Sequence, residues 1–134
     1  MKEPALDLAL LTGLNCWGAA LAADMLTLQI GPPRPSRSAM GRARNTGAWA
    51  LHVQGHRSVV DGDRPVDDPV AFLQGERAIR SVRLEADGRL TLHLDGDVAL
   101  RIVPDGSTAE QWRLFAPGRS GAHLVWEQGR LSRH

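Results

Sequence analysis

The sequence predicts a mainly β (α+β) fold, in which an antiparallel meander curls into a partial barrel or sandwich and carries one or two short helices. Three observations favour it. Apolar and polar residues alternate strictly between residues 82 and 102, Asp-Gly turns separate the alternating runs, and helical periodicity is scarce. A chain of 134 residues fits one domain. We therefore expect a single domain over 1–134 with an exposed Pro/Arg-rich loop at 31–47.

The meander is the clearest element. A three-residue loop at 86–88 sets Leu84 opposite Leu90 and places Gly88 at the left-handed position that such a loop requires. The same reasoning makes 95–97 the second loop, with Leu94 opposite Val98. A slip of one residue would turn each apolar face into solvent, so the pattern fixes the register. The aliphatic residues of this face are Val82, Leu84, Leu90, Leu92, Leu94, Val98, Leu100 and Ile102.

Other segments predict further strands and short helices. Alternating runs predict strands at 25–30, 48–54 and 122–128 and a short strand at 58–60. The stretch 4–11 is compatible with an N-terminal helical turn, and 67–76 with a short helix that starts at Pro69. Ser107 and Glu110 have capping-box spacing, although the residues that follow also suit a strand.

The segment 31–47 holds three prolines, four arginines and almost no large apolar side chain. It predicts a long, exposed, mobile loop between two strands. Its cluster of Arg34, Arg37, Arg42 and Arg44 resembles arms that grip phosphates. No aromatic residue interrupts the cluster and no nucleic-acid module motif is present, so a nucleic-acid role is disfavoured.

Two histidines and two aspartates raise the question of a metal site. Histidines four apart share an ion on a helix, but His52 and His56 lie in strand-like sequence, where that spacing separates them by about 13 Å. Asp61 and Asp63 resemble the start of a calcium loop, yet its twelfth position is Phe72 in place of a glutamate. We expect no metal and no cofactor, and interpret these residues as a polar strand face and a turn.

Motifs for covalent or nucleotide chemistry are missing. Cys16 is the only cysteine, which excludes an internal disulfide and fits a reducing cytoplasm. No nucleophile elbow, phosphate loop or dinucleotide glycine pattern occurs, so the sequence leans away from an enzyme. A continuous signal-peptide core and a membrane span are also absent from the pattern.

The four tryptophans, Trp17, Trp49, Trp112 and Trp126, stand beside only two phenylalanines and no tyrosine. Packing in and around the core explains them. A second interpretation puts Trp112 and Arg113 at a binding surface, because tryptophan and arginine often carry interface energy. The predicted interaction surface comprises Trp112, Arg113, Arg34, Arg37, Arg42 and Arg44.

The stretch "EQWRLFAPGRSGAHLVWEQGRL", together with "ADMLTLQIG" and "ALHVQ", resembles small bacterial β-rich proteins that carry a domain of unknown function. The resemblance covers about half the chain and implies an immunity-protein-like role in binding a partner. It brings no catalytic residues with it. The fifteen arginines against a single lysine indicate a GC-rich bacterial source.

We therefore expect a non-catalytic, cytoplasmic module that binds an unidentified protein, with a homodimer as one form of that partnership and no membrane partner. The alternative is a small-ligand-binding β-barrel, or a metal-dependent enzyme that uses His52, His56, Asp61 or Asp63.

Overall fold

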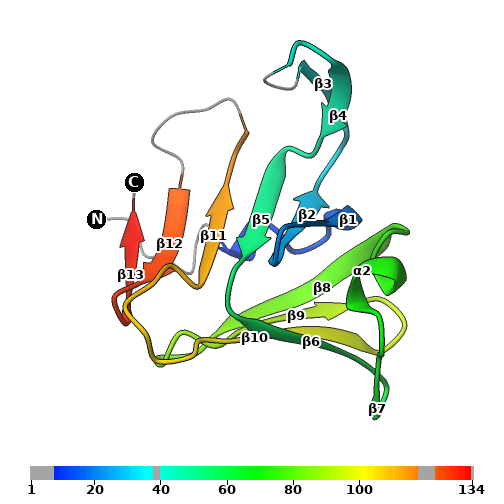
Figure 1. The fold of residues 1–134 in the computed structure, drawn as a ribbon. Coiled ribbons are helices and arrows are strands. Elements are labelled where there is room, and N and C mark those ends of the chain that lie inside the picture. The colour runs from blue at the N-terminus through cyan, green and yellow to red at the C-terminus, as the bar shows by residue number, and fades with distance from the viewer. Residues whose placement is uncertain (1–7, 38–39, 118–122, 134) are drawn as a thin grey trace.

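The computed structural model describes residues 8–37, 40–117 and 123–133 of the chain. Figure 1 shows strands running through almost the whole molecule. In chain order they are β1 (Asn15–Ala22), β2 (Met25–Ile30), β3 (Arg34–Arg37), β4 (Ala43–Thr46), β5 (Trp49–Val53), β6 (His56–Asp61), β7 (Arg64–Pro65), β8 (Arg77–Leu84), β9 (Leu90–Leu94), β10 (Val98–Val103), β11 (Trp112–Phe115), β12 (His123–Glu127) and β13 (Arg130–Arg133), and α2 (Pro69–Phe72) is a short helix.

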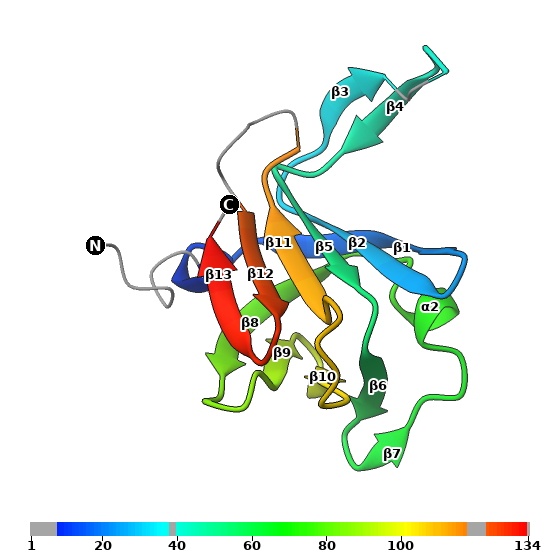
Figure 2. The same ribbon diagram turned by 60° about the vertical axis from the view of Figure 1, so that its left-hand side comes forward.

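One large antiparallel sheet forms the body. Its hydrogen-bonded order is β13-β12-β11-β5-β2-β1-β8-β9-β10-β6-β7. Only two residue pairs, Asn15 with Ala78 and Cys16 with Arg77, join β1 to β8. Figures 1 and 2 show the sheet turning sharply at that junction, so that the half from β13 to β1 crosses the half from β8 to β7. The sheet folds over itself without closing into a barrel, and the predicted mainly β fold class is confirmed.

The meander has the predicted register. Leu84 pairs with Leu90 across the first loop, and Leu94 pairs with Val98 across the second. Leu92 is paired with Val82 on one side and Leu100 on the other, as the alternation required. Gly88 has a φ of 91°, the left-handed conformation expected at its loop position. The hydrophobic pattern therefore determined the pairing, because any other register would expose the apolar face.

The core fills the space between the two halves of the sheet. The alternating residues predicted for β2 are all fully buried, and those of β5 and β12 join the same cluster. They meet the aliphatic face of the meander from the other half. The largest fully buried side chains are Trp112, Leu11, Leu26, Leu28, Ile30, Leu51, Leu73, Ile79, Leu90, Leu92, Leu100 and Ile102.

Two tryptophans hold the first meander turn against the opposite half. Trp112 and Trp126 are directly paired between β11 and β12. The indole Nε1–H of Trp112 donates to the Gly88 carbonyl oxygen at 3.1 Å. The ring of Trp126 occupies the place where a side chain on Gly88 would lie. The glycine at this turn thus serves both the left-handed backbone and the contact between the halves.

The chain passes from one half to the other at Gly55, between β5 and β6. The backbone N–H groups of Gln54 and Gly55 both donate to the Gln111 carbonyl oxygen, at 2.8 and 3.0 Å. A side chain on Gly55 would collide with the Gln111 amide, 2.5 Å from its Oε1. The bend therefore separates the strand predicted at 48–54 from the one predicted around 58–60, which is longer than expected and begins at His56.

The exposed loop predicted at 31–47 contains regular structure that the sequence did not predict. Its described residues form a separate two-stranded sheet, β3 paired with β4, although the segment is exposed as expected. Sequence patterning missed the hairpin because no described residue of β3 or β4 belongs to the core cluster, so no apolar alternation marks these strands.

The short helix is confirmed at α2. The Asp68 carboxylate caps it by accepting the Ala71 N–H at 3.2 Å, and Pro69 opens it. Ser107 accepts a hydrogen bond from Ala109 in a turn, and the residues after Glu110 form strand β11 in place of a helix. The first residues of the stretch 4–11 lie outside the described part of the chain. No helix among the described residues has the length and apolarity needed to cross a bilayer.

Candidate interaction surface

The β3–β4 hairpin is an excursion from an otherwise tight connection. Ile30 at the end of β2 pairs directly with Trp49 at the start of β5, so residues 31–48 leave the body and return to the same point. Figures 1 and 2 show the hairpin standing away from both halves of the sheet. Adjacent antiparallel strands are ordinarily joined by two to five residues. The body does not need so long a connection for its topology.

The base of the hairpin is firmly attached. The Gly31 N–H donates to the Asn15 carbonyl oxygen at 2.8 Å, and the Gly47 N–H donates to the Gln29 side-chain oxygen at 2.9 Å. The indole N–H of Trp17 donates to the Gly31 carbonyl oxygen at 2.9 Å. These contacts fix where the hairpin leaves the body.

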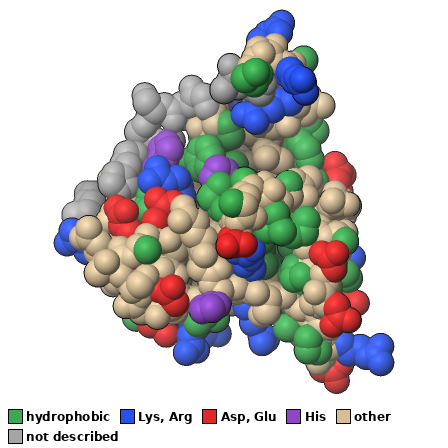
Figure 3. All heavy atoms as spheres, in the orientation of Figure 1, with side chains coloured by type: hydrophobic (Ala, Val, Ile, Leu, Met, Phe, Trp, Pro, Cys, Tyr) green, Lys and Arg blue, Asp and Glu red, His purple; other side chains and the backbone are tan. Residues whose placement is uncertain are grey.

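The hairpin carries charge of one sign. The segment 31–47 contains four arginines and no acidic residue. All four arginines are exposed, and the space-filling view shows blue side chains at the projecting end of the molecule with no red among them (Figure 3). Arg37 donates from its Nη1 to the Gly41 carbonyl oxygen at 3.0 Å. The structure therefore places the predicted Arg34, Arg37, Arg42 and Arg44 on one projecting element.

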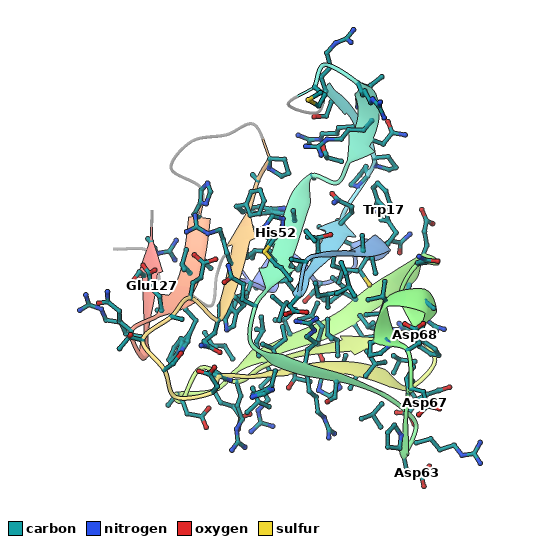
Figure 4. The ribbon with its side chains drawn as sticks, in the orientation of Figure 1. Trp17, His52, Asp63, Asp67, Asp68 and Glu127 are labelled. Carbon is teal, nitrogen blue, oxygen red and sulfur yellow. The ribbon has the colours of Figure 1, made fainter. Side chains whose placement is uncertain are left out.

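A cluster of rings lies on the face of β5, β11 and β12 that points away from the core. His52 meets Phe115 edge-on, with ring centroids 4.7 Å apart, and Phe115 stacks on His123 at 5.2 Å. Figure 4 shows His52 on β5 beside β11. The strand register brings these residues together, because Phe115 pairs with His123 in the neighbouring strand. Alternation placed His52 on the outer face, but no pattern in the sequence indicated its ring partners.

Arg113 lies at the edge of this ring cluster in a dense polar network. Its guanidinium contacts the Glu110 carboxylate, with Nη2 at 2.8 Å and Nε at 3.2 Å from Oε1. Its Nη1 is 2.8 Å from His123 Nδ1. A guanidinium can only donate, so His123 accepts with Nδ1 and carries its proton on Nε2. Arg113 thus ties β11 to β12 through side chains.

Burial lowers the pKa of His52 below its ordinary value. The Glu110 carboxylate acts in the opposite direction, and the positive charge of Arg113 adds to the lowering. The imidazole is therefore neutral near pH 7. The uncharged imidazole ring packs against Phe115 and does not contribute a positive charge.

The prediction that Trp112 forms an exposed pair with Arg113 was wrong for the tryptophan. Trp112 is 0% exposed and points into the core, whereas Arg113 points out. Successive residues of a strand face opposite sides of the sheet, so the two side chains cannot share one surface. The packing interpretation is correct for Trp112, and Trp126 is likewise buried.

The residues singled out for metal chemistry are spread over the molecule. His52 belongs to the β5 half, and His56 begins β6 beyond the bend. Asp61 ends β6 about 16 Å further along the strand, given the usual rise per residue. Figure 4 shows Asp63 at the β6–β7 turn, at the far end of the molecule from His52. Within the described ranges, no three His, Cys, Asp or Glu residues are grouped to hold a metal ion.

The turn interpretation of Asp61 and Asp63 is confirmed. Gly62 between them has a φ of 64° and its N–H donates to the Asp97 carbonyl oxygen at 2.8 Å. The two Asp-Gly-Asp turns, at 61–63 and 95–97, therefore lie side by side at one end of the β10–β6 pair.

No protein-family model, no curated protein and no solved structure matched the chain significantly. The resemblance to immunity-like bacterial proteins therefore stays a hypothesis.

Proposed function

We propose that this chain is a non-catalytic protein-binding module and that the β3–β4 hairpin is its main contact element. The observation that carries the proposal is the excursion of residues 31–48 from a point where β2 and β5 are already paired. None of the described hairpin residues belongs to the core cluster. An element that the fold does not use for its own packing is available for a partner.

The stability of the hairpin supports the same conclusion. A two-stranded hairpin alone is marginally stable in water, because it has no third strand or packed face. β3 and β4 each have four residues and pair only with one another. A partner that packs against them would order the hairpin further.

The composition of the hairpin suits an interface. Protein interfaces are enriched in arginine and methionine, which combine charge or polarisability with long apolar stems. Met40 is 85% exposed close to the hairpin tip, in the company of the four arginines.

Several features support a non-catalytic role. Burial raises the pKa of the Cys16 thiol to about 11, so the only thiol of the chain is a poor nucleophile at neutral pH. The ring of His52 packs edge-on against Phe115, with centroids 4.7 Å apart. A bacterial, cytoplasmic location and an immunity-like role belong to the same proposal, and the solitary buried cysteine is compatible with a reducing compartment.

The test removes the hairpin and leaves its base. In the trimmed variant an Asn-Gly pair replaces residues 33–46, so that Gly31 and Gly47 keep their contacts. The full chain and the trimmed variant are immobilised separately and exposed to extract of the source organism, and the captured proteins are identified by mass spectrometry. We expect a partner that the full chain retains and the trimmed variant loses.

A second copy of the chain among the captured proteins would identify the partner as a homodimer. Capture of the same proteins by both forms, or of none by the full chain, would contradict the proposal. Circular dichroism of the trimmed variant checks that the body is folded before the comparison is made.

A further inference from the structure

We propose that the partner presents an extended acidic segment, with carboxylates on alternate residues, to one face of the β3–β4 hairpin. This inference rests on the proposed function and names the chemistry of the partner. The face is defined by Arg34, Ser36, Arg44 and Thr46, and is called the donor face below.

The strand register creates the donor face. Arg34 is paired with Thr46, and Ser36 is paired with Arg44. Directly opposed residues of an antiparallel pair point to the same side, as do residues two apart in one strand. The four side chains therefore share one face, with the guanidiniums on one diagonal and the hydroxyls on the other. Each of them can donate a hydrogen bond to an anion.

The opposite face has a different chemistry. Pro35 is paired with Asn45, and Arg37 is paired with Ala43. Arg37 is the one arginine within the two strands on that side, and its Nη1 already donates to the Gly41 carbonyl oxygen. The proline has no N–H and the alanine has no polar atom. This second face offers a poor site for an anion, and it supplies a control within the same hairpin.

Arg34 and Arg44 have guanidiniums that are available to a ligand. Both are exposed, and neither makes a hydrogen bond or an ion pair with any described residue. Guanidinium forks bind carboxylates through two parallel hydrogen bonds, which gives both strength and direction. The donor face thus presents two guanidinium groups that can each bind a carboxylate.

The distance between the Arg34 and Arg44 positions favours a ligand in an extended conformation. Diagonal neighbours of an antiparallel pair have centres about 7–8 Å apart. Side chains two apart on an extended strand point the same way and lie about 6.6–6.8 Å apart. Carboxylates on alternate residues of an extended segment therefore match the two guanidiniums, whereas carboxylates three apart point to different sides.

The same observations favour a protein over a nucleic acid. Single-stranded nucleic acids bind to surfaces that combine positive charge with aromatic stacking platforms. Segment 31–47 contains no aromatic residue, and the chain as a whole carries a net charge of only +1. A pair of arginines with hydroxyl donors between them is suited to a few fixed carboxylates more than to a long polyphosphate.

The experiment uses two peptide isomers and one nucleic-acid probe. The alternating peptide is Thr-Asp repeated four times and followed by two threonines. The spaced isomer has the same four aspartates and six threonines, with every aspartate three residues from the next. A short oligothymidylate with four phosphates is the third probe. Each carries a fluorescent label, and its affinity for the full chain is measured by fluorescence anisotropy at low ionic strength.

Two double variants with the same loss of charge are compared with the native chain. R34Q/R44Q removes both guanidiniums of the donor face. R37Q/R101Q removes one arginine from the opposite hairpin face and one exposed arginine from β10, in the other half of the sheet. All four positions are exposed, so both variants should fold, which circular dichroism verifies.

We expect the alternating peptide to bind the native chain about tenfold more tightly than the spaced isomer, because each bond to a charged group contributes roughly that factor. R34Q/R44Q should lower this affinity about tenfold or more, and R37Q/R101Q less than about threefold, because only the first pair meets the carboxylates directly. Equal affinities of the two isomers, or equal losses of affinity in the two variants, would show that binding depends only on net charge and would overturn the inference. Tighter binding of the oligothymidylate would assign the face to a nucleic acid.

The outcome also separates this inference from the proposed function. If the chain captures its partner only with the hairpin present but binds the two peptide isomers equally, the proposed protein-binding function is supported and the acidic-segment inference is wrong. If the trimmed variant captures the same proteins as the full chain, the proposed function is contradicted, whatever the affinities of the two peptides.

Discussion

At the scale of single residues, Gly88 is the position where backbone and packing demands meet. Its φ of 91° is a region that side chains disfavour, and Trp126 fills the space beside it. We expect Gly88→Ala to lower the free energy of unfolding by at least about 2 kcal/mol, since the left-handed backbone costs about 1–2 kcal/mol and overpacking adds to it. Urea unfolding measures the change.

Gly106 provides the matched control for that substitution. It also has a positive φ, of 83°, but an added Cβ would meet no atom within 4 Å. Gly106→Ala should cost only the backbone contribution, about 1–2 kcal/mol. Equal losses in the two variants would show that Trp126 moves aside and that the contact between turn and indole is weak.

His52 makes the stability of the protein depend on pH. Its pKa is lowered in the folded state, so as the pH falls below about 6.5 the unfolded chain takes up a proton that the folded chain resists. Stability therefore falls on acidification and rises with pH through this window. We expect His52→Gln to reduce the difference in unfolding free energy between pH 7.5 and pH 5.5.

Urea unfolding of the native protein and of His52→Gln is measured at both pH values. If His52→Gln leaves the difference between the two pH values unchanged, burial of the imidazole is not its source.

At the scale of elements, Gln111 organises the connection from β10 to β11. Its amide nitrogen donates to Asp105 Oδ1 at 2.9 Å and Ser107 Oγ at 3.2 Å, and its oxygen accepts the Asp105 N–H. The Ser107 N–H, 2.8 Å from the Asp105 carboxylate, holds the pKa of Asp105 below its usual value. The buried Gln111 side chain thus supplies hydrogen bonds to a connection that has no strand pairing of its own.

Substituting Gln111 tests this role. We expect Gln111→Leu to lower the free energy of unfolding by about 1–3 kcal/mol, because the partners of the amide lose their hydrogen bonds. Limited proteolysis should then cut within 104–110 faster than in the native chain. The exposed Gln54, whose side-chain amide donates to the Glu110 carboxylate at 3.3 Å, is the control, and Gln54→Leu should change stability by less than about 0.5 kcal/mol. Similar effects of the two changes would contradict the central role of Gln111.

At the scale of the whole molecule, the body and the hairpin have separate physical bases. The two halves of the sheet are joined by a short β1–β8 ladder, by the tryptophans at Gly88 and by the bend at Gly55. Their common core makes unfolding of the body cooperative, whereas no described residue of the hairpin belongs to that core.

This separation predicts that the hairpin can be removed without loss of the body. The trimmed variant should have a free energy of unfolding within about 1 kcal/mol of the native chain, because shortening a connection changes only its closure entropy. Thermal and urea unfolding measure the difference. A drop of several kcal/mol would mean that the hairpin supports the body, and would weaken the argument that it exists for a partner.

Much of this architecture follows from local patterns. The meander, its register and its glycine turn follow from the alternation of Leu84, Leu90 and their neighbours, because a strand with one buried face has only one acceptable pairing. The capped helix at Pro69 follows equally from local chemistry. The face of His52 could also be assigned, since it lies between Leu51 and Val53.

The interaction surface was only partly predictable. The arginines of 31–47 were identified, but their arrangement into a hairpin with one donor face was not, since strands without a buried face carry no apolar period. Trp112 was assigned to a surface because tryptophan and arginine stood side by side in the sequence. The pleat of β11 sends them to opposite faces.

The sequence by itself determined the strands that bury one face, their turns and the pairing of neighbours along the chain, because these depend on residues a few positions apart. Only the tertiary structure decided how the sheet folds over itself at β1 and β8, which outer residues meet around Phe115, and how the arginines share a face. Those features depend on contacts between distant segments, and no short-range pattern in the chain encodes them.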